Sequence, residues 1–127
     1  MKKNRNSKIL VVDDSSTNVI LLDAILNDKG YQIDTALNAK EALQILRKER
    51  PDLILLDLLM PHISGVEFLE KIKKNNDTKD IPVIIISAVT NSEYIEKTMR
   101  LGAVDYFKKP IDIQNFINKV ETVLKQK

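Results

Sequence analysis

The stretch Leu53-Ile54-Leu55-Leu56-Asp57-Leu58-Leu59-Met60-Pro61 decides the fold of this chain. Four aliphatic residues run without a break into one carboxylate, Asp57, and more apolar residues and a proline follow. A continuous apolar run of this length is typical of a strand buried on both faces, as in a parallel sheet covered by helices. Asp is a poor strand residue, and open α/β sheets place their chemistry at the carboxyl ends of such strands. Asp57 is therefore either a functional carboxylate or a turn residue that ends the strand.

The rest of the chain repeats this strand-then-helix pattern without a linker, an internal repeat or a low-complexity segment. Besides the strand that ends at Asp57, strands are expected over Lys8–Val12, Tyr31–Ala36, Ile81–Ser87 and Ala103–Phe107. Alternation of this kind predicts a parallel sheet with right-handed crossovers and helices on both faces. We therefore expect a single doubly wound α/β domain over residues 1–127, with residues 1–7 as a flexible basic tail.

Helix boundaries are predicted from capping residues and glycines. The expected N-terminal caps are Ser15 or Ser16, Asn38 with Glu41, Ser64 with Glu67, Asn91 or Ser92, and Asp112. Gly30 and Gly102 are expected to end the first and fourth helices. The apolar face of the last helix is predicted to consist of Ile113, Phe116, Ile117, Val120 and Leu124.

The composition excludes several classes of function. Hydrophobic residues make up 43% and charged residues 30% of the 127, which is the balance of a soluble globular domain. The absence of cysteine excludes disulfides and thiolate metal sites and is compatible with a cytoplasmic location. One histidine, His62, argues against a His-rich metal site or a serine-hydrolase triad and is expected to be a surface residue. No segment is long enough to span a membrane, and a net charge of +2 gives no argument for binding nucleic acid.

Polar residues end the core strands, and all of them converge on one edge of the predicted sheet: Asp13-Asp14, Asp57, Ser87 and Lys108-Lys109. Clustered carboxylates repel one another unless a cation lies between them, and carboxylate oxygens with open water positions suit Mg²⁺. A metal, a lysine and a hydroxyl around one carboxylate are what an aspartyl-phosphate requires. Taken singly, each residue also has an ordinary explanation as a helix N-terminal acid, a strand end or a surface lysine.

The sequence resembles the receiver domains of two-component response regulators along essentially its whole length. The matching features are the strand ending in Asp13-Asp14, the run Asp57-Leu58-Leu59-Met60-Pro61 with Gly65 beyond it, Ser87-Ala88, and Tyr106-Phe107-Lys108-Lys109-Pro110. The resemblance implies the strand order 2-1-3-4-5 and a cis peptide bond between Lys109 and Pro110.

The same resemblance implies a role for each site residue. Asp13, Asp14 and Asp57, with the backbone carbonyl of Leu59, would hold Mg²⁺, which Mn²⁺ can replace. Asp57 would accept the phosphoryl group, and Ser87 and Lys109 would contact its oxygens. Tyr106 matches the aromatic position that turns inward when the serine follows the phosphoryl group.

The expected function is that of a phospho-accepting signalling switch rather than an enzyme. A histidine kinase or histidine phosphotransfer protein would donate the phosphoryl group. The surface of the fourth helix, fifth strand and fifth helix would then engage an output partner or a second copy of the chain. One alternative is an aspartyl-phosphate hydrolase, which commonly needs a second acid two residues after the nucleophile, where this chain has Leu59. Another is an interaction domain that works without phosphorylation.

Overall fold

The computed structural model describes residues 7–59 and 64–125, so the expectations for the tail before Ser7 and for His62 lie outside the described residues. Five strands are present: β1 (Lys8–Val12), β2 (Gln32–Ala36), β3 (Leu53–Leu56), β4 (Val83–Ser87) and β5 (Asp105–Lys108). Five helices alternate with them: α1 (Ser16–Asp28), α2 (Ala39–Lys48), α3 (Gly65–Lys74), α4 (Ser92–Arg100) and α5 (Ile113–Lys125). None of these helices is both long enough and apolar enough to cross a bilayer.

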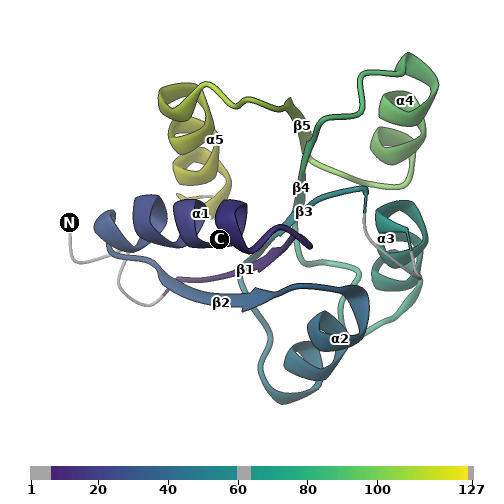
Figure 1. Cartoon of the computed structure of the whole chain (residues 1–127). Coiled ribbons are helices and arrows are strands. Elements are labelled where there is room, and N and C mark those ends of the chain that lie inside the picture. Colours follow the sequence, from purple (N-terminus) through teal and green to yellow (C-terminus); the bar gives the residue numbers. More distant parts are fainter. Residues whose placement is uncertain (1–6, 60–63, 126–127) are drawn as a thin grey trace.

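The strands form one parallel sheet in the order β2-β1-β3-β4-β5, as the resemblance implied. Helices α1 and α5 lie on one face, and α2, α3 and α4 lie on the other (Figure 1). Because side chains alternate along a strand, each central strand contributes to both layers of the core. In β3, Leu53 and Leu55 pack toward α1 and α5, whereas Ile54 and Leu56 pack toward α2 and α3.

Strand boundaries differ from the expectations by one or two residues. Strand β2 begins at Gln32, and the preceding Tyr31 is buried beneath α1 and α5 without belonging to the sheet. Strand β4 begins after Pro82, which has no N–H to donate to the ladder. Strand β5 is shifted toward the C-terminus and includes Lys108.

The prediction for the apolar face of α5 is wrong at Ile113. Phe116, Ile117, Val120 and Leu124 are buried, but the Ile113 side chain is 46% exposed. Ile113 is the first residue of α5, and it borders a surface hollow near the carboxyl edge of the sheet.

The N-terminal caps of the helices are the residues predicted from the sequence, with one difference in a single contact. Ser15 caps α1, Asn91 caps α4, and the Asp112 side chain accepts from the Asn115 N–H at the start of α5. Ser64 and Glu67 form the expected capping box. The Asn38 pair differs in one contact, because its partner Glu41 accepts from the Leu37 N–H instead of the Asn38 N–H.

Backbone hydrogen bonds continue past the ends of the strands and hold the predicted site residues in place. The Asp13 N–H donates to the Ala36 carbonyl, the Asp57 N–H to Val12, and the Lys109 N–H to Ser87. The peptide bond between Lys109 and Pro110 is cis, as the resemblance implied. The side chains at this edge are therefore carried by main chain that is fixed by the sheet.

Gly65, the first residue of α3, makes the closest backbone approach near Asp57. Its N–H donates to the Leu58 carbonyl at 2.9 Å. A Cβ at this position would lie 2.5 Å from the Asp57 carbonyl oxygen and 2.5 Å from the Leu58 Cα. Both of these atoms belong to the backbone, so no side-chain rotation can relieve the overlap. Only glycine fits here.

We predict that Gly65→Ala destabilises the fold by about 2–3 kcal/mol, the upper part of the range for overpacking. Alanine usually stabilises a helix relative to glycine, so a loss of stability identifies the backbone contact as its cause. Urea unfolding measures the change. Ser92→Ala, at the equivalent first position of α4 on an exposed surface, serves as the control and should stay within about 0.5 kcal/mol of wild type. A Gly65→Ala protein as stable as this control would contradict the prediction.

Candidate functional site

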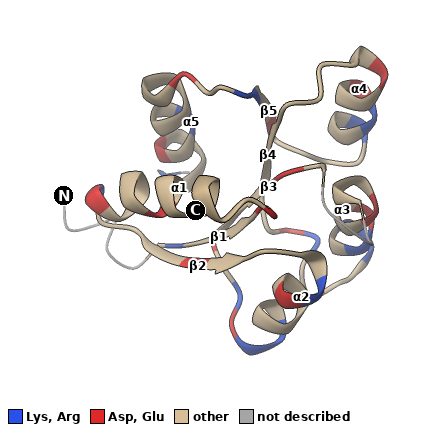
Figure 2. Ribbon diagram, in the orientation of Figure 1, with Lys and Arg blue, Asp and Glu red and all other residues tan. Residues whose placement is uncertain are grey.

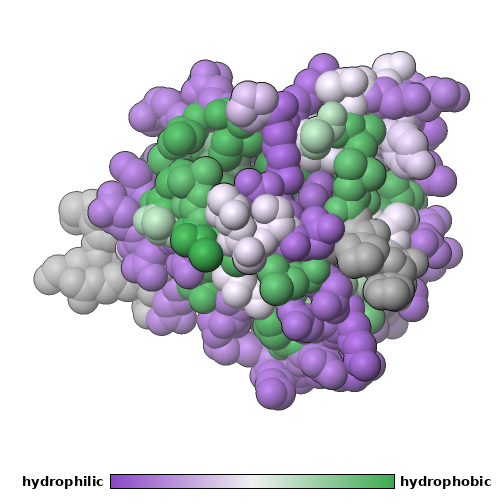
Figure 3. All heavy atoms as spheres, in the orientation of Figure 1, coloured by the Kyte–Doolittle hydropathy of each residue, from purple (hydrophilic) through white to green (hydrophobic). Residues whose placement is uncertain are grey.

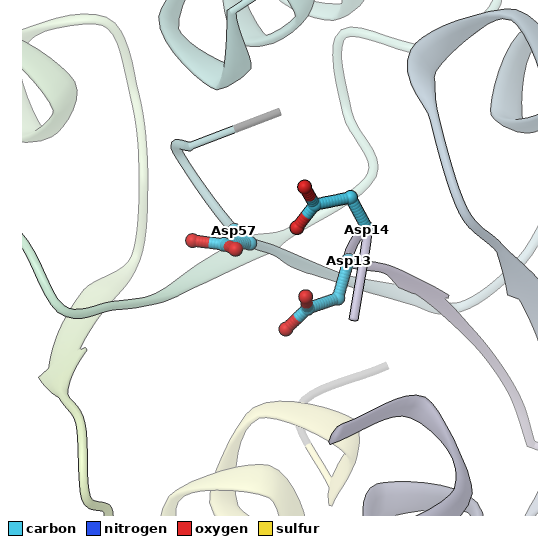
Figure 4. Close-up of side chains that lie close together, drawn as sticks. All are labelled: Asp13, Asp14 and Asp57. Atoms are coloured by element: carbon cyan, nitrogen blue, oxygen red, sulfur yellow. The ribbon is translucent and has the colours of Figure 1, made fainter. Parts of the chain in front are cut away.

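Three carboxylates meet at the carboxyl edge of the sheet. Asp13 and Asp14 follow β1 and extend toward Asp57, which follows β3 (Figure 4). One oxygen from each of the three lies within 4.8 Å of the others, and Asp13 and Asp57 are buried while Asp14 is exposed. The structure therefore brings together all three carboxylates that the sequence singled out.

Asp13 is held by several donors, from the start of α1 and from Lys109, which follows β5. Its Oδ1 accepts from the Ser15 N–H at 2.9 Å, and its Oδ2 accepts from the Asn18 amide at 3.5 Å. Lys109 Nζ donates to the same Oδ2 at 3.0 Å. These contacts orient the carboxylate, because a buried charge is tolerated only when it is paired and hydrogen-bonded.

Lys109 connects the two buried carboxylates. Its Nζ lies 3.0 Å from Asp13 Oδ2 and 3.5 Å from Asp57 Oδ2, so one ammonium group forms ion pairs with both carboxylates. Figure 2 shows red ribbon where the chain leaves β1 and β3 and blue ribbon at the end of β5. The Lys109 ammonium group, from the residue directly before Pro110, therefore lies beside both carboxylates.

The surroundings of Asp57 disfavour its ionised form. Burial raises its pKa above the usual 3.8, and the negative charge of Asp13 raises it further. Lys109 and the Leu59 N–H, which donates to Asp57 Oδ1 at 3.3 Å, act in the opposite direction but do not reverse the shift. The site is thus short of positive charge.

The donor set fits a divalent cation. Three carboxylates offer hard oxygen ligands within a few ångströms, and the exposed Asp14 leaves room for water, which suits Mg²⁺ better than a softer metal. The raised pKa of Asp57 points the same way, because an additional cation would favour its ionised form.

Ser87 and Tyr106 lie in one short chain of hydrogen bonds beside the carboxylates. Ser87 is fully buried, and its Oγ accepts from the Val89 N–H at 3.2 Å. The Tyr106 hydroxyl donates to the Val89 carbonyl at 2.6 Å. Burial raises the pKa of the Tyr106 phenol, contact with the Ser87 hydroxyl lowers it, and the charge of Asp57 raises it further. The pKa of the Tyr106 phenol therefore depends on the charge of Asp57.

An apolar hollow of about 480 Å³ adjoins the acidic site. Asp13, Asn18 and Lys109 line its polar side. Leu21 of α1 and Ile113 of α5 border it and are about half exposed, in the hydrophobic surface over α1 and α5 that Figure 3 shows. An exposed apolar hollow next to a reactive group is typical of a surface that receives a partner.

Residues 9–121 match the family model of the response regulator receiver domain. This chain belongs to that family. The receiver domain is 41% identical over 119 residues to sporulation initiation phosphotransferase F of Bacillus subtilis, with 94% of each chain covered. It is also 41% identical over 119 residues to a probable cyclic di-GMP phosphodiesterase of Vibrio cholerae, of which it covers only 27%. The crystal structure of the receiver domain of NtrX from Brucella abortus superimposes with a TM-score of 0.86 at 33% identity, covering 94% and 99% of the two chains.

The Asn18 side chain and the Val89 carbonyl are among the contributors to the receiver site that were not predicted from the sequence. Asn18 reaches Asp13 because it lies three residues after the Ser15 cap, on the turn of α1 that faces back to β1. That spacing could have identified it. The Val89 carbonyl could not have been found, since a backbone acceptor leaves no trace in residue identity.

We predict that Asp57→Asn raises the free energy of unfolding at neutral pH without divalent cations, by on the order of 1 kcal/mol. The folded-state pKa of Asp57 is raised, so its ionised form opposes folding. Its unfavourable contribution appears as the pH rises from the unfolded-state pKa through the folded-state pKa. The gain from Asn should therefore disappear below about pH 3.8, the usual value.

Urea unfolding between acidic and neutral pH measures this difference. Glu96→Gln, an exposed carboxylate on α4, is the matched control and should change little at any pH. Saturating Mg²⁺ should stabilise wild type more than Asp57→Asn. Equal stability of wild type and Asp57→Asn throughout the pH range would refute the electrostatic account.

Proposed function

We propose that this receiver domain is a phospho-accepting switch in which Asp57 takes a phosphoryl group from a phosphohistidine. Receiver domains act with histidine kinases or phosphotransfer proteins and with output domains, and the family assignment provides this general role. The observation that carries the proposal is a buried carboxylate, Asp57, that shares Lys109 with a second buried acid.

Asp13, Asp14 and Asp57, together with the Leu59 carbonyl, would hold Mg²⁺, and Mn²⁺ would replace it. When bound, the cation supplies positive charge that offsets the charge on the phosphoryl oxygens. The protein's own part is positioning: Lys109 and the Leu59 N–H hold Asp57, while Ser15, Asn18 and Lys109 hold Asp13.

In the transfer step, an Asp57 carboxylate oxygen attacks the phosphorus and the bond from phosphorus to the partner's imidazole nitrogen breaks. The phosphohistidine ring carries a proton on its other nitrogen, so the electron pair of the broken bond leaves with a neutral imidazole, and Asp57 becomes an acyl phosphate. Lys109 compensates charge on the transferred group, and Ser87 donates a hydrogen bond to one of its oxygens. Ionised Asp57 is the nucleophile, so a cation that lowers its raised pKa also favours the reaction.

The phosphodonor would dock on the apolar hollow beside Lys109. Leu21 on α1 and Ile113 on α5 provide exposed aliphatic contacts next to Asp13. A helix of the donor that carries its phosphohistidine could bury these side chains and so present phosphorus to Asp57. The Ile113 side chain, left outside the core, is thereby given a function.

The acyl phosphate would then draw Ser87 away from Val89. The Tyr106 hydroxyl donates to the Val89 carbonyl, so Tyr106 would move with this loop. The surface of α4, β5 and α5 would then change. Tyr94, Met99 and Val104 expose apolar side chains on or beside these elements. We assign this surface to an output partner or to a second copy of the chain.

We propose that residues 1–127 work as one receiver domain in the cytoplasm, without direct binding to nucleic acid. A hydrolase is disfavoured because Leu59 presents an apolar side chain, 58% exposed, where such enzymes use an acid. A phosphorylation-independent interaction domain is disfavoured because the complete set of Asp13, Asp14, Asp57, Ser87 and Lys109 is present.

Phosphorylation by a small acyl-phosphate donor tests the assignment of the nucleophile. Wild type should incorporate one phosphoryl group in the presence of Mg²⁺, and Asp57→Asn should incorporate none, as measured by intact-mass spectrometry. Asp80→Asn, in the exposed loop before β4, should react like wild type. Asp13→Ala should lose the saturable Mg²⁺ response of the Tyr106 and active-site amide signals. Equal phosphate incorporation in wild type and Asp57→Asn would remove Asp57 from its proposed role.

We also predict that Ser87→Ala accepts phosphate but loses most of the structural response. A hydrogen bond to a charged group contributes roughly 1.5–3 kcal/mol, enough to move a two-state equilibrium by about one to two powers of ten. Amide shifts across residues 90–118, with phosphate or beryllofluoride, measure the response. Ser16→Ala, at an exposed position of α1, is the control and should show the same amide-shift response as wild type. A wild-type pattern in Ser87→Ala would show that the signal takes another route.

A further inference from the structure

We propose that the groove between the C-terminal ends of α2 and α3 binds an acidic segment of a partner protein that carries aliphatic side chains. The groove has a volume of about 860 Å³ and is larger than the hollow beside Lys109. It lies at the opposite end of the sheet from Asp57, where the chain enters β3 and β4. This binding function is separate from phosphoryl transfer and does not depend on it.

The groove has an aliphatic floor. Leu43 and Leu46 of α2 are half-buried there, and Ile72 of α3 and Ile81 before β4 lie below them in the core. Arg50 connects the two sides, because its guanidinium donates to the Asp77 carbonyl at 2.6 Å. The walls are thus linked to each other, while the half-buried leucines remain accessible from solvent.

The rim of the groove is cationic. Five exposed basic residues line it: Arg47, Lys48, Arg50, Lys71 and Lys74. Two acidic residues also line it, and one of them, Glu49, already pairs with Lys8. Within residues 7–59 and 64–125, none of the five cations takes part in an ion pair. Figure 2 shows the blue segments on α3 and on the connection that follows α2.

Helix dipoles explain only part of this charge. Basic residues in the last turns of α2 and α3 complement the negative ends of those helices. Arg50 lies beyond the end of α2, however, and the dipole gives no reason for an accessible aliphatic floor between the cations. Aliphatic contacts below and unpaired cations around them complement a polypeptide with carboxylates beside leucine-like side chains. A nucleic acid fits less well, since no aromatic side chain lines the groove for base stacking.

The experiment uses the whole chain and a synthetic acidic peptide in which leucines recur at helical spacing between glutamates. Amide shifts report where it binds, and their titration gives the affinity. We expect saturable shifts over residues 43–50 and 71–81. A companion peptide with serine in place of leucine should bind much more weakly. Added salt should weaken binding, because the rim charges are exposed.

Charge-reversed variants test the surface. Arg47→Glu with Lys71→Glu should weaken binding at least roughly tenfold, since two surface attractions become repulsions. Arg47→Gln with Lys71→Gln removes the two charges without adding repulsion and should give a smaller loss of affinity. This variant replaces the charge reversal as the test if the reversal perturbs folding. Lys29→Glu with Lys97→Glu makes the same change in net charge at two exposed positions, one directly after α1 and one on α4, and this variant should bind like wild type. Asp57→Asn should also bind like wild type, which separates this proposal from the phosphoryl switch.

Four results with the peptides would overturn the proposal. They are the absence of saturable shifts, shifts that map outside the groove, equal binding of the leucine and serine peptides, and equal losses in the groove and control charge reversals. Tighter binding of a single-stranded oligonucleotide at the same residues would assign the groove to nucleic acid instead.

Discussion

Two buried acids and one ammonium group set the conditions for the whole carboxyl edge of this domain. Asp13 and Asp57 both contact Lys109, at 3.0 Å and 3.5 Å, and a third carboxylate from Asp14 lies nearby. Like charges 4 Å apart repel by about 4 kcal/mol at an effective dielectric constant of 20, and one lysine offsets only part of this. The receiver domain therefore keeps a charge imbalance that ligands can relieve. A divalent cation bound between the carboxylates would relieve it directly. The proposed conversion of Asp57 to an acyl phosphate would change the charges at the site again.

Such an imbalance is tolerated because the sheet below it is rigid. Strands β1 and β3 are almost completely buried, and their neighbours hold the main chain of Asp13 and Asp57 by ladder hydrogen bonds. The main-chain segments that carry Asp13 and Asp57 cannot move apart without breaking those hydrogen bonds. On the far side of Asp57, Gly65 brings the start of α3 against the same backbone. The packed backbone around Asp57 thus holds the acids close together, and their closeness is the cause of the electrostatic repulsion.

Much of this arrangement could be predicted from the sequence, for identifiable reasons. Unbroken aliphatic runs predict strands buried on both faces, and parallel strands bring Asp13, Asp57, Ser87 and Lys109 to one edge. The strand order came from resemblance, because alternation alone does not distinguish among the possible orders. Ile113 was assigned to the apolar face of α5, but helical periodicity does not show that this first residue lies exposed beside a surface hollow. The Val89 carbonyl was missed, because every residue has one and only the fold selects it.

The Tyr106 hydrogen bond has a consequence for how this domain can diverge. Its acceptor is the main-chain carbonyl of Val89 and not a side chain. A substitution at position 89 would keep the acceptor, provided that the loop backbone is preserved. The half-buried side chain at that position is then free to adapt to a different partner or to alter access to Asp57. Related proteins can therefore vary the chemistry of this loop over evolutionary time while retaining the same mechanical linkage to the fifth strand.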